Sequence, residues 1–553
     1  MLANDVYAGA NALAATRLTN PGVGTLTAFN GDGSFTYQAP ATPPGDPLTV
    51  TKLWNTSSGG SDEYHELVAD LNGDGFPDVI SFDFNSPIRA RSGLDGSQLW
   101  SADNPGATDC RLNLGAGSAD HRVLADINDS GHPTLVFTTL FDRNDPTGST
   151  WEDSILAFDH IGKVKWVSPP LSKPHPDIRR GATPVPPGGF TPGGLAHGRG
   201  LSVARLSAAG PPVLLMRAEI PVNDGYTFYR DAANADHYAG CRAVTGLAAD
   251  ENVACRATFI ISGTDGSVLQ TLVVRNPDAL AHFGGPNSLS QMPPIAMDID
   301  GDGRVDLVSG TEVWMQNAGG GFDFAWQLTT SVNDTAVADL DGDGKAEIIH
   351  IRSNGGDVDL RGIFIYSYDG QLKRRIPLQA AWITPLTIAD VDGDGRSDIV
   401  VGGDGTLFAF RDDGRPIWAY KVPQDVPTDP ILAPFYTQPP QELAVANAAP
   451  QVYDLDGDGV AEVVFSAHSR IIILNGRTGV RKVDPYWTFN DSYHDVSALM
   501  LIDVNNDGHV DIVQNAPFFF NCLNPGVAPA CAGLVGPVAL SGGGSNNWLP
   551  GPK

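Results

Sequence analysis

A nine-residue acidic sequence occurs six times in this chain of 553 residues. Each copy places oxygen-bearing side chains at positions 1, 3, 5 and 9 and a glycine at position 6. Glycine allows the backbone to turn sharply, and several oxygens on one loop are the ligands that a hard cation such as calcium prefers. The repeat therefore predicts six calcium loops. They are Asp70–Asp78, Asp298–Asp306, Asp339–Glu347, Asp390–Asp398, Asp454–Glu462 and Asp503–Asp511.

The predicted ligands of each loop are the side chains at positions 1, 3, 5 and 9 and the backbone carbonyl of position 7, at about 2.3–2.6 Å from the ion. No carboxylate stands at position 12, where an EF-hand loop needs one, and short apolar runs flank each copy, so each loop joins two strands. The ligand residues are Asp70, Asn72, Asp74, Phe76 and Asp78; Asp298, Asp300, Asp302, Arg304 and Asp306; Asp339, Asp341, Asp343, Lys345 and Glu347; Asp390, Asp392, Asp394, Arg396 and Asp398; Asp454, Asp456, Asp458, Val460 and Glu462; and Asp503, Asn505, Asp507, His509 and Asp511.

Two further segments keep the same register but have lost ligands. In Asp126–Thr134 only Asp126 is acidic at a liganding position, which leaves a seventh and weaker calcium site open. Arg205–Val213 has no acidic ligand, and we predict that it holds no ion. With these two segments the unit occurs eight times, with 41 to 93 residues between successive first positions. That spacing suits a structural repeat with insertions of variable length.

Downstream of several loops, a glycine precedes a tryptophan by four residues. We interpret each case as a hairpin whose glycine turns the chain and whose tryptophan packs between neighbouring sheets. One unit is then strand, calcium loop, strand, strand, turn and strand, which makes a four-stranded blade. Eight units predict an all-β chain folded as an eight-bladed β-propeller, with seven blades as the alternative. The four cases are Gly96–Trp100, Gly162–Trp166, Gly414–Trp418 and Gly544–Trp548.

These motifs resemble the FG-GAP repeats, also called VCBS repeats, which form the propellers of integrin α subunits and of many bacterial surface proteins. The resemblance extends over about residues 48–553. It implies calcium loops on one face of a propeller and partners on the opposite face or the side. Eight units differ from the seven of integrins, so integrin-type partner binding is not implied. The glycine–tryptophan pairs also resemble the docking motifs of quinoprotein dehydrogenases, but this chain lacks the adjacent cysteines usual near that cofactor.

Residues 1–47 have a different character. Leu2–Asp5, Gly24–Thr27 and Asp32–Tyr37 resemble parts of the cadherin-like, immunoglobulin-type repeats of bacterial adhesins, and a proline-rich linker follows them. Only the middle of such a domain is present, and so short a sandwich cannot bury a sufficient core alone. Either the chain is a fragment of a longer protein, or a neighbouring segment or molecule completes the sheet by strand addition, which would be a route to self-assembly.

The net charge of −29 comes largely from the loops, and six calcium ions would neutralise 12 of these charges. The acidity, with no basic stripe, argues against a nucleic-acid partner. No run approaches the ~18 apolar residues of a membrane-spanning helix. Because such loops fill at the millimolar calcium found outside cells, we expect an extracellular or cell-surface location.

Five cysteines fit the same location. The simplest disulfide pairing joins Cys241 to Cys255 and Cys522 to Cys531 and leaves Cys110 over. Other connectivities stay open, because spacing alone does not decide between them.

Two long insertions interrupt the regular units, at residues 168–200 and 219–257. Long loops on a rigid scaffold often carry binding sites, so both are candidate ligand sites, although covering an edge of the fold would also account for them. Four histidines precede innermost strands and could converge in the central channel, but their unequal offsets favour ordinary hydrogen-bonded histidines. They are His65, His121, His197 and His494.

These features together predict a secreted or surface-attached propeller that binds a protein or glycan ligand or assembles with itself, with calcium serving the architecture. The alternative is an enzyme resembling the eight-bladed rhamnogalacturonan lyases, which break acidic polysaccharide by β-elimination. Candidate groups for that chemistry are His175, Arg179, Arg180 and His197. No catalytic motif of fixed spacing accompanies them, so we favour a binding protein over an enzyme.

Overall fold

A computed structural model of the chain shows regular structure made of β-strands throughout its described part. The described residues are 25–29, 35–38, 51–55, 67–81, 88–102, 122–140, 150–151, 153–168, 175–176, 200–220, 255–274, 293–328, 332, 334–352, 361–378, 380, 383–423, 449–467, 470–483, 486–487, 499–514 and 538–541.

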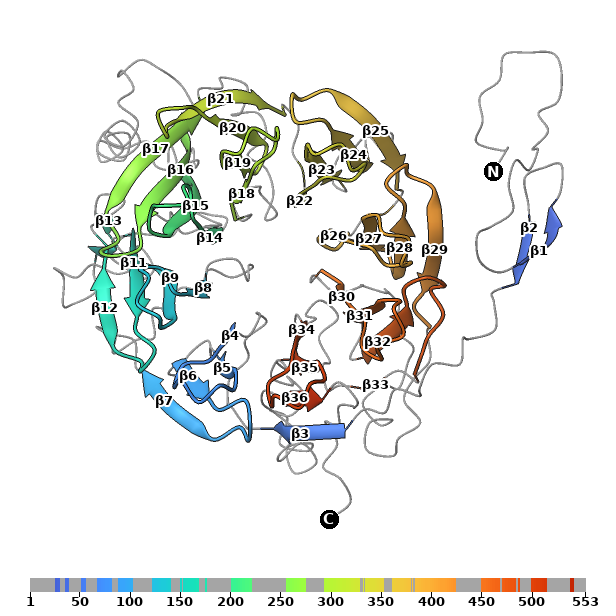
Figure 1. The fold of residues 1–553 in the computed structure, drawn as a ribbon, viewed down its shortest axis with the longest axis horizontal. Helices are drawn as coiled ribbons and strands as arrows, with labels where there is room; N and C mark the ends of the chain where they lie inside the picture. Colours follow the sequence, from blue (N-terminus) through green and yellow to red (C-terminus); the bar gives the residue numbers. More distant parts are fainter. Residues whose placement is uncertain are drawn as a thin grey trace.

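Eight four-stranded antiparallel sheets form a ring around a central axis, so the prediction of an eight-bladed propeller is confirmed (Figure 1). We number these sheets blades 1 to 8 along the chain. From the innermost strand outward, the first four are blade 1 with β4 (Leu67–Ala69), β5 (Asp78–Ser81), β6 (Ile88–Arg91) and β7 (Gln98–Ala102); blade 2 with β8 (Arg122–Ala125), β9 (Thr134–Leu140), β11 (Asp153–Phe158) and β12 (Val164–Val167); blade 3 with β14 (Leu201–Ala204), β15 (Val213–Ile220), β16 (Cys255–Ser262) and β17 (Val268–Val274); and blade 4 with β18 (Ile295–Met297), β19 (Asp306–Ser309), β20 (Glu312–Gln316) and β21 (Phe322–Gln327).

The next three blades follow the same order. They are blade 5 with β22 (Asp334–Ala338), β23 (Glu347–Arg352), β24 (Gly362–Tyr366) and β25 (Leu372–Pro377); blade 6 with β26 (Thr387–Ala389), β27 (Asp398–Gly403), β28 (Thr406–Phe410) and β29 (Pro416–Lys421); and blade 7 with β30 (Gln451–Tyr453), β31 (Glu462–Ser466), β32 (Arg470–Asn475) and β33 (Tyr486–Trp487).

Blade 8 is built from both ends of the chain. Its inner strands are β34 (Leu499–Ile502), β35 (Asp511–Gln514) and β36 (Val538–Ser541), and its outermost strand is β3 (Thr51–Asn55). β3 pairs antiparallel with β36, with Thr51 opposite Ser541 and Asn55 opposite Val538. The ring is therefore closed by backbone hydrogen bonds between segments nearly 500 residues apart. The last predicted tryptophan motif, Gly544–Trp548, lies outside the described residues.

The core lies between the faces of neighbouring blades. Second strands such as β5 and β27 are buried along their whole length, because a blade is covered on both sides. This is why they read as continuous apolar runs rather than as alternating patterns. At the first interface, Ile80 and Ala90 of blade 1 pack with Phe137 and Phe158 of blade 2, whose stacked rings lie 5.7 Å apart between centroids.

Among the described residues, tryptophans on outermost strands join five of the blades to the next one, so the prediction that they pack between neighbouring sheets is confirmed. Trp100 of blade 1 donates a hydrogen bond from Nε1 to the carbonyl of His160 in blade 2, at 2.8 Å. Gly162 in that turn has φ of +80°, and a Cβ there would lie 2.6 Å from the Trp100 ring. The glycine and the tryptophan of one motif thus serve two different interfaces. Trp166, Trp326, Trp418 and Trp54 make the equivalent bond to Gly263, Tyr368, Gly476 and Gly93.

Two short hairpins lie apart from the blades. β1 (Thr25–Phe29) pairs with β2 (Phe35–Gln38) outside the ring (Figure 1). The cadherin-like interpretation of residues 1–47 stays a prediction. β10 (Thr150–Trp151) pairs with β13 (His175–Pro176), which ties the first long insertion to the connection between β9 and β11.

Candidate metal centres

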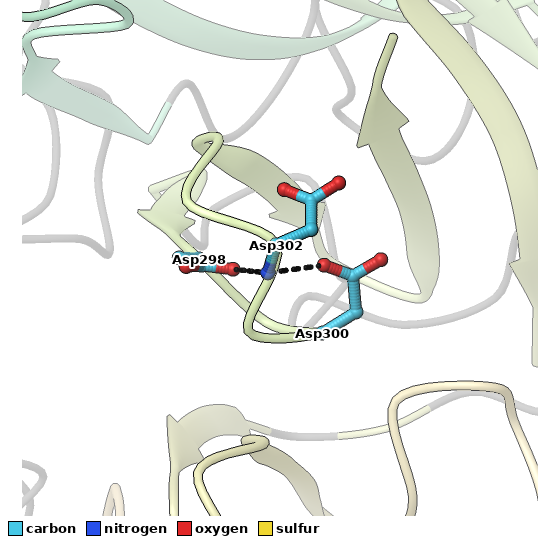
Figure 2. Close-up of side chains that lie close together, drawn as sticks. All are labelled: Asp298, Asp300 and Asp302. Carbon is cyan, nitrogen blue, oxygen red and sulfur yellow. Dashed lines mark hydrogen bonds between the residues drawn. The ribbon is translucent and has the colours of Figure 1, made fainter.

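Each acidic loop joins the innermost strand of a blade to the second strand, as the flanking sequences predict. In blade 4 the Asp298 carboxylate accepts hydrogen bonds from the backbone N–H groups of Gly301 and Gly303, both at 2.8 Å. The N–H of Asp302 donates to Asp298 and to Asp300, both at 3.1 Å (Figure 2). The backbone of the loop therefore wraps around the side chains at positions 1 and 3, and these hydrogen bonds keep the acidic groups close together.

The loops gather carboxylates closely enough to share one ion. Asp298, Asp300 and Asp302 offer oxygens that all lie within 4.8 Å of one another. Charges this close repel strongly unless a cation neutralises them, so the donor set fits a calcium ion. Equivalent clusters are Asp339, Asp341 and Glu347; Asp390, Asp392 and Asp398; and Asp454, Asp456 and Glu462. The ion's identity and the ligation by position 7 carbonyls stay predictions.

The first and last loops have asparagine at position 3 but keep the same frame. The Asp70 carboxylate accepts from Gly73 N at 2.7 Å and from Gly75 N at 2.9 Å. In the last loop, Asp503 accepts from Gly508 N at 2.9 Å. Asparagine still supplies an oxygen, so both loops keep four liganding side chains with one charge fewer.

Position 9 anchors every intact loop to the blade. This carboxylate is buried in all six, and one of its oxygens accepts a hydrogen bond from the backbone N–H of position 2, at 2.8 to 3.2 Å. Position 2 is always Leu, Ile or Val, and its side chain is buried in the core. This role of position 2 was not predicted, although an apolar residue stands there in all six copies. The buried position 2 residues are Leu71, Ile299, Leu340, Val391, Leu455 and Val504.

The altered loops use other means to stay closed. Asp126 keeps the frame by accepting from Ser130 N at 2.9 Å and from Gly131 N at 2.6 Å. In blade 3 the Arg205 guanidinium donates to the carbonyl of Gly210 in its own loop, at 2.6 Å, and pairs with Asp129 of blade 2. A positive charge thus stands where the other loops begin with a carboxylate. That this loop holds no ion stays a prediction.

Among the described residues, basic side chains from outside the nonamer contact three of the intact loops, which was not predicted from the sequence. Lys373 contacts blade 5's loop, Arg411 contacts blade 6's loop and Lys482 contacts blade 7's loop. Hydrogen bonds to Asp341 and Glu347 raise the pKa of Lys373. Burial by itself lowers the pKa of Lys482, but its hydrogen bonds to Asp456 and Glu462 outweigh burial and raise it. Both lysines are therefore ammonium ions at neutral pH.

We expect the calcium-free protein to become more stable as the pH falls from about 8 to about 5. Burial is the main cause that raises the pKa of Asp398 to about 7 and of Asp78 to about 6, from an ordinary 3.8. Between the ordinary pKa of 3.8 and the raised pKa values, the folded protein binds more protons than the unfolded chain. Its free energy of unfolding therefore increases as the pH falls through 7. Melting temperatures of calcium-stripped protein in resin-treated buffers measure this. Asp398→Asn should flatten the profile, and a melting temperature that decreases over the same interval would contradict the expectation.

Other candidate residues are only partly described. His175 lies in β13 and Cys255 begins β16. The other nominated residues, namely Arg179, Arg180, His65, His121, His197, His494, Cys110, Cys241, Cys522 and Cys531, lie outside the described residues, so the channel, disulfide and catalytic predictions stay untested. In the described part of the chain, no helix is long and apolar enough to span a membrane.

Comparison with known proteins supports the fold. Residues 298–350, which include the loops of blades 4 and 5, match the family model of an FG-GAP-like repeat. No curated protein matches the chain. Among solved structures, the V. cholerae biofilm matrix protein Bap1 is similar, with 13% identity, a TM-score of 0.52 and coverage of 90% of this chain and 91% of that chain.

Two rhamnogalacturonan lyases are also similar. YesW is 13% identical with a TM-score of 0.45, covering 94% of this chain and 79% of that chain. The Bacillus licheniformis enzyme PL11 is 12% identical with a TM-score of 0.45, covering 92% and 78%. Likeness at this level carries no argument about function. The fold and the loops define an all-β propeller that contains an FG-GAP-like repeat.

Proposed function

We propose that this protein is a secreted or surface-attached propeller that is stabilised by calcium and binds or assembles through the edge opposite its calcium loops. The observation that carries the proposal is the difference between the two edges of the ring. One edge is held together by short loops and turns, and the long insertions leave from the other.

The loop edge serves the architecture. The third-to-fourth strand turns lie beside the calcium loops, because Arg304 Nε donates to the carbonyl of Gln316 at 2.9 Å. Neighbouring loops also bond to one another, since Ala346 N donates to Ile299 O at 2.8 Å. The loop carboxylates are occupied in fixing backbone N–H groups, which suits an ion that holds structure.

The opposite edge carries the connections of variable length. Because antiparallel strands alternate in direction, the connection from β15 to β16 and that from β12 to β14 both leave from this edge. Ile220 pairs with Cys255 at the base of the second insertion, so two adjacent strand ends support it. Long loops supported by a rigid sheet are where proteins commonly place binding residues.

The proposed partner is a protein or glycan at the extracellular surface, with self-assembly through residues 1–47 as a second contact. Bap1 is described as a biofilm matrix protein, which agrees with adhesion or assembly as the class of activity. The acidity of the chain disfavours nucleic acid.

The test removes the second insertion. Residues 221–254 are replaced by a short glycine–serine linker between Ile220 and Cys255, together with Cys255→Ser because its predicted partner Cys241 is removed. Binding to immobilised polysaccharides and surface proteins should be lost while the melting temperature is kept, and replacing residues 141–149 in the same way is the control. Undiminished binding would contradict the proposal. Release of unsaturated uronides from pectic polysaccharide would support the lyase instead.

A further inference from the structure

Two of the six intact loops differ from the others in sequence and in surroundings. The loops of blades 5 and 7 end in Glu347 and Glu462, whereas the other four end in aspartate. In the structure these two loops each receive a lysine from an outer part of the same blade. The longer acid and the lysine occur together in both blades.

The lysines contact the same carboxylates that are predicted to hold calcium. In blade 5, Lys373 Nζ lies 2.7 Å from Asp341 Oδ2 and 2.8 Å from Glu347 Oε1. These acids occupy positions 3 and 9 of the loop. The ammonium group of Lys373 therefore lies between the two sides of the predicted metal site.

Blade 7 repeats this arrangement in a more buried form. Lys482 Nζ lies 2.7 Å from Glu462 Oε1 and 3.4 Å from Asp458, and it also pairs with Asp456. The side chain of Lys482 is 6% exposed, that of Asp456 3% and that of Glu462 0%. A buried charge is retained only where it is paired, and here one ammonium satisfies three carboxylates.

The extra methylene of glutamate explains why these two loops can accept a lysine. In blade 4 both oxygens of Asp306 are held by backbone, Oδ2 by Ile299 N at 3.0 Å and Oδ1 by Gln316 N at 2.8 Å. In blade 5, Glu347 Oε2 keeps the bond to Leu340 N at 2.9 Å, and Oε1 extends to the lysine. Glu462 divides its oxygens in the same way between Leu455 N and Lys482.

We propose that Lys373 and Lys482 act as tethered cations in the loops of blades 5 and 7, so that calcium binds at the four loops that end in aspartate. A metal ion beside either ammonium would bring like charges together next to a buried glutamate, since Glu347 is 4% and Glu462 0% exposed. The loop of blade 6 stays in the calcium-binding group, because Arg411 pairs with Asp392 and Asp394 at positions 3 and 5, whereas both lysines pair with the position 9 carboxylate. This inference rests on the calcium part of the proposed function.

The test counts bound calcium. Wild-type protein, Lys373→Met, Lys482→Met and the double variant are equilibrated with about 1 mM free calcium by dialysis, and calcium per chain is measured by elemental analysis. Each single variant should bind one more calcium than wild type, and the double variant two more. Lys421→Met is the matched control, because Lys421 is an exposed lysine of β29 and lies outside every acidic loop. It should leave the number unchanged.

A second measurement covers variants that fold poorly without metal. The melting temperature of each variant is compared with and without calcium, and calcium should raise it more for Lys482→Met than for wild type. Variants that bind as many ions as wild type would overturn the lysine assignment, whatever that number is. A wild-type protein without bound calcium would contradict the proposed function, and the lysine assignment would then stand only if the variants gained one ion each.

Discussion

Removing calcium should lower the melting temperature of this protein by about 5–8 °C. Each site at ten times its dissociation constant adds about 1.4 kcal/mol to the free energy of unfolding, so four independent sites add about 6 kcal/mol and six add about 8 kcal/mol. A chain of this size unfolds with an entropy near 1 kcal/mol per kelvin, which sets the temperature shift. Differential scanning calorimetry of stripped and reloaded protein measures it.

The loss should be graded around the ring, because each blade contacts only its neighbours. After calcium removal, limited proteolysis should cut first at the four loops that end in aspartate. The loops of blades 5 and 7, which Lys373 and Lys482 contact, should be cut later. Asp392→Ala should weaken blade 6 and leave distant blades bound to calcium. Asp413→Ala, an acid of the same blade outside the loop, serves as control. Equal melting temperatures and unchanged cutting after chelation would mean that the loops are incidental to stability.

The number and type of blades could be predicted because each unit carries its own local signals. A nonamer between two apolar runs specifies two strands and their connection within about 20 residues. The tryptophans were informative because each one fills an interface that every blade must make. Trp326 was missed because it lacks a glycine four residues before it, although it makes the same bond to the next blade.

The lysine contacts could not be predicted from the sequence, because they depend on the fold bringing distant segments together. The predicted ligands lie within nine residues, so their clustering follows from the loop itself. Lys373 follows Glu347 by 26 residues and reaches it only because β25 folds back along the blade. The only local sign of the lysine contacts was glutamate in place of aspartate at position 9. The sequence did not show which side chain would contact that glutamate.

Closure of the ring was also beyond the sequence, because strand pairing between β3 and β36 leaves no local mark. Residues 51–55 are separated from their partners at residues 538–541 by nearly 500 positions. In the structure Trp54 is 7% exposed and packs with Val79 of blade 1 and with Val504 and Val513 of blade 8. Its Nε1 donates to the carbonyl of Gly93 in blade 1. β3 therefore completes one blade and docks it against another.

Deleting residues 1–57 should destabilise the propeller severely, whereas deleting residues 1–47 should leave its melting temperature nearly unchanged. The longer deletion removes β3, exposes the edge of β36 to intermolecular pairing and leaves the seam between blades 8 and 1 without its tryptophan. Trp54→Ala in the full chain isolates the last effect and should cost about 3–5 kcal/mol. Thermal melts and light scattering of the three variants measure stability and aggregation.

The shorter deletion is the matched control, because it removes the β1–β2 hairpin outside the ring and keeps every strand of blade 8. If both deletion variants have the same melting temperature as the full chain, β3 does not close the ring. If both lose stability equally, residues 1–47 belong to the propeller's cooperative unit and are not a separate segment. We expect the full chain and the 1–47 deletion to melt alike, Trp54→Ala to melt at a lower temperature, and the 1–57 deletion to melt at the lowest temperature and to aggregate. This order follows only if β3, held to β36 by hydrogen bonds, closes the ring of eight blades.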